Sequence, residues 1–274
     1  HLSGDKLLHM VHTRDGSISA VNIICAANAK NRKKIVRALK GHVSKCAKDE
    51  YGHMVLLAIL SVVDDTVLVD KVVIKEVVEN LKDLCFDKYG KRVILYLLDP
   101  LGRVHVPASV HDILMPSDKV IEASHMVVPS AEYDSDDEDE KQNETANGDA
   151  KPTTVCKKSV ERKCPELLFG GSKLAQHLLD LCSNECEGML CTPHASDVIV
   201  ETVSAQGKGL FKSKIGEDKL ENLHGSILGV LLEACKSDEI AGTMLDNFYG
   251  SRALQRLVLA SPSGKDSIAK KLWK

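Results

Sequence analysis

Basic side chains gather in three places along this sequence, and the chemistry they offer is the neutralisation of phosphate groups. They are Lys30, Arg32, Lys33, Lys34, Arg37 and Lys40 around one predicted helix, Lys45 and Lys48 just after it, and Lys88, Lys91 and Arg92 at a later turn. Lys and Arg contact phosphate whatever the base sequence, and a guanidinium can also stack on a base. The alternative for residues 30–40 is a helix face that contacts only solvent.

Other reactive residue types form no catalytic or metal-binding pattern. The sequence has no glycine-rich phosphate loop, no nucleophile elbow and no HExxH helix. Cys182, Cys186 and Cys191 lie between His177 and His194, but they form no Cys-x₂-Cys knuckle, and cysteines four residues apart are equally typical of a helix core. We therefore expect a protein that is not an enzyme and that has neither a metal site nor a cofactor.

The net charge of −3 conceals an uneven distribution. Residues 131–150 contain nine acids and one base, a net −8, so the rest of the chain carries +5. The first 60 residues hold ten Lys or Arg against four acids. The acidic run is either a solvated insertion or a polyanion that competes with RNA for the basic surface, in which case its deletion should strengthen RNA binding at low salt.

Composition favours helices packed by aliphatic side chains, because 43% of residues are hydrophobic and only 4% are aromatic. The longest apolar run, 54–63, falls short of the roughly 18 residues that a membrane span requires.

Nine cysteines outside a small secreted scaffold indicate free thiols in a reducing, intracellular compartment. The chain opens at His1 without a Met or a leader, which indicates a piece of a longer protein.

Three segments repeat one pattern, in which a turn glycine leads into an apolar helix. They are TRDGSISAVNIICAA (13–27), DEYGHMVLLAILSVV (49–63) and DKYGKRVILYLLDPL (87–101). Their glycines, Gly16, Gly52 and Gly90, are separated by 36 and 38 residues, which is a solenoid period. Amphipathic helices are predicted between them over 31–47 and 66–85. Each repeat is therefore expected to be a helical hairpin.

The pattern stops after Pro100 and returns near residue 160. Residues 102–160 contain several Gly and Pro residues and the acidic run, and we expect a linker that is disordered over 125–158. Helical periodicity resumes over 164–182, 194–206, 223–235 and 247–260. The expected fold is all-α: helical repeats of an α-solenoid over 1–101, a linker with a disordered acidic segment 131–150, and degenerate helical repeats over 161–274.

The phrases DEYGHMVLLAIL and DKYGKRVILYLL resemble the core helix of a Pumilio (PUF) repeat. Followed by a charged linker and then by CPELL and HASDVIVETV, they resemble the nucleolar Puf-A/Penguin-like subfamily with its Penguin-like (CPL) region, and its plant members above all. The resemblance implies a right-handed solenoid of Pumilio-type repeats that binds nucleic acid on its concave surface, with further N-terminal repeats outside this piece. It also implies a nucleolar or nuclear location, with the cytoplasm as the alternative, and a role in pre-rRNA processing and ribosome biogenesis.

In the family pattern, the residue after the turn glycine and the one four positions later read the base edge, and the residue next after the first stacks on the base. The edge pairs here are Ser17 and Val21, His53 and Leu57, and Lys91 and Leu95, with Ile18, Met54 and Arg92 at the stacking positions. Val21, Leu57 and Leu95 have no donor or acceptor, so base readout is not expected in these repeats. Ser251, Arg252 and Gln255 form a competent set, the combination the family uses for adenine.

We therefore predict a noncatalytic protein that holds RNA through phosphate contacts, occasional stacking and shape. The expected RNA partner is pre-rRNA, and the alternative is mRNA 3′-untranslated regions, as in Pumilio regulators of translation and mRNA stability. Duplex DNA is expected as a nonspecific ligand and ribosome-assembly proteins as protein partners. No membrane partner is expected. The rival hypothesis is a helical-repeat scaffold for proteins, which the apolar edge positions favour and the basic cluster opposes. Salt dependence discriminates between them, because binding through phosphates weakens steeply with salt.

Overall fold

The computed structural model describes residues 9–100, 156–207, 217–236 and 244–260, together with nine residues between 108 and 120. Every regular element within these ranges is a helix, which confirms the all-α prediction. None of the helices in the described part of the chain is long and apolar enough to cross a bilayer. The acidic segment 131–150, predicted to be disordered, lies outside the described residues.

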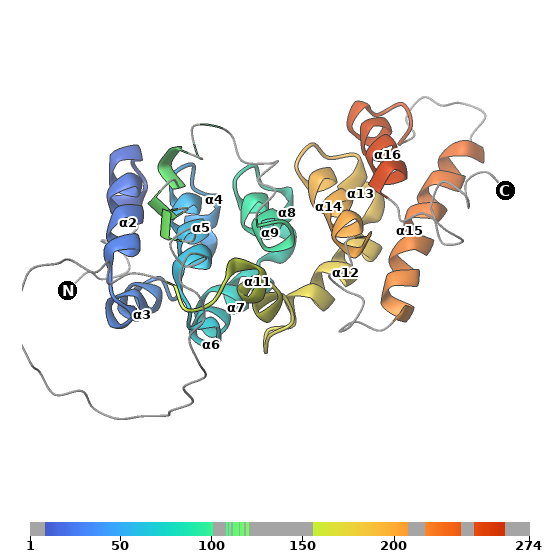
Figure 1. The fold of residues 1–274 in the computed structure, drawn as a ribbon. Coiled ribbons are helices and arrows are strands. Elements are labelled where there is room, and N and C mark those ends of the chain that lie inside the picture. Colours follow the sequence, from blue (N-terminus) through green and yellow to red (C-terminus); the bar gives the residue numbers. More distant parts are fainter. Residues whose placement is uncertain are drawn as a thin grey trace, which may run out of the picture.

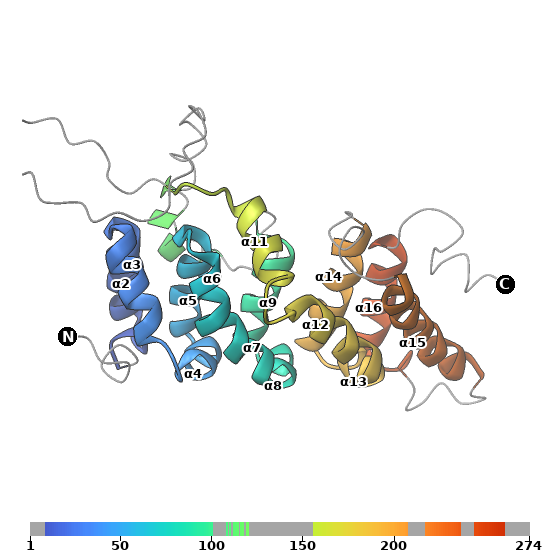
Figure 2. The ribbon, with the colours of Figure 1, turned by 90° about the horizontal axis from the view of Figure 1, so that it is seen from below.

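The helices form two rows, one above the other in Figure 1. The inner row consists of α2 (Arg14–Ala26), α5 (Gly52–Val62), α9 (Gly90–Leu98), α14 (Ala195–Gly207) and α16 (Phe248–Ala260), each packed on the next. The outer row consists of α3 (Ala29–Ala38), the continuous run of α6 (Thr66–Val69), η1 (Asp70–Ile74) and α7 (Lys75–Glu79), then α12 (Leu174–Asn184) and α15 (Glu217–Lys236). Figure 2 shows the short helices α4 (Val43–Lys48), α8 (Leu81–Phe86) and α13 (Cys186–Leu190) aligned along one edge. The arrangement is the predicted α-solenoid.

Aliphatic side chains fill the space between the rows. Ile24, Val36, Leu56, Ile74 and Leu97 are at most 1% exposed. Helix α5 has no polar stripe at all, since each of its 11 residues is buried. Burying a Leu or Ile side chain contributes about 1.5–3 kcal/mol, so this layer is the chief source of stability.

In the first two repeats the chain forms three helices, where the sequence periodicity predicted a two-helix hairpin. The predicted helix 31–47 is divided at Gly41, whose φ of +80° lies in the left-handed region that glycine adopts without strain. The predicted helix 66–85 is divided at Asn80, between α7 and α8. The apolar spacing continues across both breaks, so helical periodicity alone does not reveal the turns.

A polar side chain caps the first turn of three inner-row helices. Oδ1 of Asp49 accepts hydrogen bonds from the backbone N–H groups of Tyr51 and Gly52, at 2.9 and 2.7 Å. Asp87 makes the same pair of bonds ahead of α9, and Asn247 makes it at the start of α16. These bonds satisfy N–H groups that a helix start leaves without partners. Capping therefore explains why the letters DEYG, DKYG and NFYG recur.

The glycine of this motif is required by a close backbone approach. A Cβ added to Gly52 would lie 2.7 Å from the carbonyl oxygen of Cys46, six residues earlier. The same carbonyl six residues back would meet a Cβ at Gly16 (1.8 Å from Met10), Gly90 (2.9 Å from Leu84) and Gly250 (2.3 Å from Met244). The repeat spacing read from the sequence thus reflects the packing of this turn.

The described chain resumes at Cys156, beside the carboxyl end of α5. The carboxylate of Asp64 accepts hydrogen bonds from the backbone N–H groups of Lys157 and Lys158, at 2.9 and 3.1 Å. The prediction of disorder up to residue 158 was therefore wrong for these residues, because Asp64 supplies partners for their backbone. Helix α11 (Val160–Leu168) then packs on α5, α6 and α9, and α12 follows it, so the later helices extend the same two rows.

Candidate nucleic-acid interface

Cationic and aromatic side chains gather at the amino-terminal ends of α5 and α9. The ring of Tyr89 stacks on the imidazole of His53, with centroids 5.4 Å apart and planes inclined by 24°. The Nζ of Lys88 and the guanidinium of Arg92 lie 4.9 and 5.4 Å from the centre of the Tyr89 ring. An aromatic ring attracts a cation placed over its face. Tyr89 therefore holds together three residues that the sequence analysis selected.

His53 is a neutral residue that orients Arg92. Its Nε2 lies 2.9 Å from Nη1 of Arg92, and because an arginine can only donate, Nε2 is the acceptor. The proton therefore sits on Nδ1, which donates to the carbonyl oxygen of Asp49 at 3.0 Å. Burial, helped by the positive charge of Arg92, lowers the pKa of His53 to about 4. The predicted RNA contact of His53 is wrong, because the residue is 0% exposed and its ring nitrogens are occupied.

Arg92 retains an unused donor. Its Nε is buried and has no hydrogen-bond partner among the described residues. Burial is the main cause that lowers the pKa of Arg92, although a guanidinium remains charged at neutral pH. A buried donor without a partner costs free energy.

A cavity of about 370 Å³ crosses the ends of α2, α5 and α9 at this point. Three cations line it, Arg14, Lys88 and Arg92, together with one acid, Glu50. The rest of the lining consists of the aromatic residues Tyr51 and Tyr89 and the apolar residues Met54, Val110 and Ile113. Three cations against one acid leave the cavity positive. It combines phosphate-binding charge with rings on which a base can stack.

Val110 and Ile113 belong to what we call the cover segment, the described residues between 108 and 120. Val110, Ile113 and Leu114 are 3%, 5% and 1% exposed and join the same core as α5. Ser117 Oγ lies 3.5 Å from Cys25 Sγ near the end of α2. In Figure 1 the segment is drawn in green beside α5. The two rows by themselves leave one side of an inner-row helix open. The cover segment packs on that side of α5, which explains why α5 is buried on every side.

The positions that would face base edges are buried in the first three repeats. Val21, Leu57 and Leu95 are 0%, 0% and 3% exposed. Ser17 is also buried, and its hydroxyl donates to the carbonyl oxygen of Val11 at 2.7 Å. These side chains therefore cannot contact the edge of a base. The predicted adenine set of Ser251, Arg252 and Gln255 is exposed on α16.

The basic cluster of residues 30–40 lies on α3 of the outer row, whereas the cavity is lined from the inner row. Lys30, Lys34 and Arg37 are exposed on α3, and Lys40 is exposed just after it. Lys33 pairs with Asp65, with 2.9 Å between Nζ and Oδ2. The structure thus separates two groups of cations that the sequence analysis combined into one surface.

Arg32 was wrongly predicted to contact phosphate. It is 5% exposed, and its guanidinium donates to the carbonyl oxygens of Ile24 at 3.0 Å, Cys25 at 2.9 Å and Val62 at 2.9 Å. These carbonyls belong to the last turns of α2 and α5, where a helix leaves acceptors without partners. Arg32 is therefore a structural residue that joins two repeats.

Two further predicted cations are paired with carboxylates. Nζ of Lys91 lies 2.5 Å from Asp197 on α14, and Arg256 on α16 reaches the same carboxylate at 2.5 Å. Nζ of Lys48 lies 3.1 Å from Asp83. Lys45 is exposed on α4. Lys91 and Lys48 therefore meet a phosphate only by giving up an ion pair, whereas Lys45 extends into solvent.

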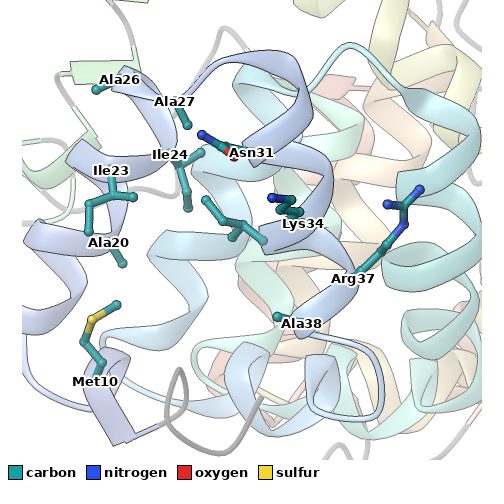
Figure 3. Close-up of a pocket in the computed structure, with 11 residues that line it drawn as sticks. Met10, Ala20, Ile23, Ile24, Ala26, Ala27, Asn31, Lys34, Arg37 and Ala38 are labelled. Atoms are coloured by element: carbon teal, nitrogen blue, oxygen red, sulfur yellow. The ribbon is translucent and has the colours of Figure 1, made fainter. Parts of the chain in front are cut away.

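A second hollow, of about 960 Å³, lies between α2 and α3 (Figure 3). Ala20, Ile23 and Ile24 line it from α2, and Lys34 and Arg37 line it from α3. Ile23 is 53% exposed. The corresponding side of the next repeat is covered by α2 and α3 themselves, which pack on α5 and on α6. This hollow is therefore an apolar surface with a cationic rim.

The cysteines that suggested a metal site are core residues. Cys182 and Cys186 are 0% and 4% exposed, and burial raises the pKa of Cys186 to about 12 and that of Cys182 well above its ordinary value. Within the described ranges, no cluster of three or more His, Cys, Asp or Glu is arranged to hold a metal ion. Buried thiols of this kind are unreactive.

Four features of the site were not predicted from the sequence: Arg14, Tyr51, Tyr89 and the cover segment. Arg14 stands two residues before its turn glycine, the position that Glu50 and Lys88 occupy in the next repeats, so the repeat register was a usable signal. Tyr89 precedes its glycine, as tyrosine does in DEYG and NFYG. The cover segment follows Pro107, and although Val110, Ile113 and Leu114 have helical spacing, nothing in the sequence indicated that the segment would line this cavity.

Comparison with known proteins gives the relatives of the chain. No family model matches it. Pumilio homolog 24 of Arabidopsis thaliana is 34% identical over 291 residues, covering 98% of this chain and 44% of the relative. Pumilio homology domain family member 6 of Saccharomyces cerevisiae is 42% identical over 111 residues, covering 40% of this chain and 17% of the relative. The chain spans less than half the length of these relatives.

Among solved structures, human Puf-A in complex with DNA has a TM-score of 0.70 and 23% sequence identity. The match covers 98% of this chain and 44% of that one. It shows that the two share the same solenoid fold.

Proposed function

We propose that this chain, which belongs to the Pumilio homology domain family, binds RNA through phosphate contacts and shape and catalyses no reaction. The observation that carries the proposal is the gathering of Arg14, Lys88 and Arg92 with Tyr51 and Tyr89 around one cavity. Cations neutralise phosphates and aromatic rings stack bases, a combination typical of proteins that bind single strands without a base code. The buried apolar residues at the edge-reading positions support the same conclusion.

The exposed cations of α3 provide a secondary surface for phosphates. Their contacts would be salt-sensitive and independent of base sequence. Duplex DNA is an expected nonspecific ligand, because the structurally similar human Puf-A was solved in complex with DNA. Binding through the phosphate backbone accommodates both nucleic acids.

For the whole protein, the proposed target is pre-rRNA in the nucleolus, with a role in ribosome biogenesis and with ribosome-assembly proteins as partners. The support is the order of Pumilio-type repeats, charged linker and Penguin-like segments along the sequence. The alternative is regulation of mRNA through 3′-untranslated regions, for which Ser251, Arg252 and Gln255 supply one reader. Crosslinking of the full-length protein to RNA in cells, followed by sequencing, distinguishes reads in pre-rRNA from reads clustered in 3′-untranslated regions.

Binding itself is tested by fluorescence-anisotropy titrations with single-stranded RNA, structured RNA and duplex DNA over a salt series. All three should bind at low salt and weaken steeply as salt rises. Reversing Arg14 and Lys88 to Glu should weaken binding to each ligand and lower the salt slope by about 2. The matched control reverses Lys71 and Lys75, which are exposed on the outer row, and should leave binding unchanged.

Two outcomes would revise the proposal. If reversing Lys34 and Arg37 abolishes binding while reversing Arg14 and Lys88 does not, the interface belongs to the outer row. If no nucleic acid binds at low salt, the proposal fails and the protein-scaffold hypothesis takes its place.

A further inference from the structure

The cover segment makes the inner-row cavity a recess with a closed apolar side. Val110 and Ile113 line the cavity together with Tyr51 and Tyr89, and the two aliphatic side chains are only 3% and 5% exposed. Arg14 and Lys88 are both exposed, whereas Arg92 is half-buried. The recess therefore has an aromatic and aliphatic interior with a cationic rim.

The size and chemistry of this recess correspond to one nucleotide. A volume of about 370 Å³ lies at the small end of the range for ligand pockets. The rings of Tyr51 and Tyr89 offer aromatic surface to a base, although one face of the Tyr89 ring is already stacked on His53. The excess of cations over Glu50 suits a phosphate. The half-buried guanidinium of Arg92 adds a third cation to the lining.

The recess lies apart from the family's edge-reading positions, although Met54 and Arg92 in its lining stand at two of the stacking positions. Tyr51 and Tyr89 come before the turn glycines, whereas the residues that read or stack a base come after them. Val110 and Ile113 come from outside the repeats altogether. Most of the residues that would hold a nucleotide here therefore lie outside the family's base code.

We propose that this recess captures a single unpaired nucleotide of the bound RNA, with its base against Tyr51, Tyr89 and the cover segment and its phosphate toward Arg14 and Lys88. The inference rests on the proposed function and names the RNA feature that the site selects. A base inside a duplex is stacked and paired, so it enters a recess only if it is first extruded, which costs free energy. Bulges, loops and single strands are therefore bound more tightly than an uninterrupted duplex.

The test compares three RNA duplexes of the same length with the unmodified protein. One is uninterrupted, one carries a single bulged adenosine, and one carries the same bulge as an abasic ribose. The abasic duplex keeps the extra phosphate and the bend, so the base is the only difference between the two bulged ligands. Anisotropy titrations at one salt concentration should show the adenosine bulge bound at least about fivefold more tightly than the abasic bulge.

A pair of variants then assigns the preference to the recess. Replacing Tyr51 and Tyr89 by Leu removes both rings and should bring the ratio of adenosine-bulge to abasic-bulge affinity close to one. Replacing both by Phe keeps the rings and should preserve the ratio. Circular dichroism and urea unfolding establish that each variant is folded, and the abasic comparison with the unmodified protein needs no variant.

The outcomes separate this inference from the function on which it rests. Equal affinity for the two bulged duplexes, with both bound in a salt-dependent manner, overturns the nucleotide recess and leaves phosphate-driven binding intact. A preference that survives in the folded double-Leu variant places base capture elsewhere and also overturns the recess. If the protein binds none of the three duplexes and no single-stranded RNA, the proposed function itself is ruled out.

Discussion

Nη1 of Arg92 on α9 lies 2.9 Å from Nε2 of His53 on α5, a hydrogen bond between two neighbouring inner-row helices. The bond requires neutral His53, because a protonated imidazole has no acceptor to offer the guanidinium. It also points the Arg92 side chain toward the face of Tyr89. One buried histidine thus determines how the most enclosed cation of the candidate interface is presented.

Acidification should destabilise the protein through His53. The pKa of this residue falls from the ordinary 6.5 to about 4 on folding, so the unfolded chain binds a proton that the folded chain excludes. The stability contributed by neutral His53 is complete above pH 6.5 and is lost as the pH falls toward 4, by about 3 kcal/mol in total. Urea unfolding of the wild type and of His53→Gln over this range measures it. The difference between the two should shrink with falling pH, and a constant difference would show that His53 does not titrate there.

Substitution of Arg32 should affect folding and not RNA binding. Arg32→Gln removes donors from three helix-end carbonyls and should lower the free energy of unfolding by about 2–4 kcal/mol. Arg37→Gln, on the exposed side of the same helix, is the matched control and should change stability by less than about 0.5 kcal/mol. Denaturant titrations give the stabilities, and anisotropy gives the salt slopes. A normal stability for Arg32→Gln together with a reduced salt slope would restore Arg32 to the interface.

Adding one methyl group should have opposite effects at two helical glycines. Gly52→Ala forces a Cβ to within 2.7 Å of the Cys46 carbonyl oxygen and should cost about 1–3 kcal/mol. Gly229→Ala, in the middle of α15 with open space around it, should stabilise by about 0.5–1 kcal/mol through higher helix propensity. Urea unfolding of the two variants supplies the comparison. Equal effects at both sites would contradict the close approach at Gly52.

Neutralising Asp197 should loosen a junction between repeats and strengthen RNA binding. Asp197→Asn deprives Lys91 and Arg256 of their shared carboxylate, which should cost about 1–2 kcal/mol because these side chains are partly buried. The released cations should raise RNA affinity and steepen its salt dependence. The control is Asp83→Asn, where the carboxylate paired with Lys48 is 69% exposed and stability should hardly change. Unchanged affinity for Asp197→Asn would place Lys91 outside the RNA path.

Capping by Asp87 should depend on its oxygen and not on its charge. Asp87→Ala leaves the N–H groups of Tyr89 and Gly90 without their acceptor and should cost about 1 kcal/mol. Asp87→Asn keeps an oxygen in the same place, as Asn247 does at the start of α16, and should be close to neutral. Thermal or urea unfolding of the two variants tests this. A large loss in Asp87→Asn would show that the negative charge matters as well.

Much of the architecture follows from the sequence by itself. The spacing of Gly16, Gly52 and Gly90 indicated the solenoid, because each glycine marks a turn where only a hydrogen atom fits. The apolar Val21, Leu57 and Leu95 indicated that base readout is lost in these repeats, since residue type alone decides whether a side chain has a donor or an acceptor. Patterns of this kind are local, and they persist whatever the rest of the chain does.

The tertiary structure alone decided which cations are available to a ligand. Arg32 and Arg37 look alike in the sequence, yet only Arg32 meets the Val62 carbonyl 30 residues away. Lys91 is paired by Asp197, 106 residues further on, and the cover segment reaches Cys25 across 92 residues. Burial and charge pairing depend on neighbours brought together by folding, and helical periodicity carries no information about partners so distant along the chain.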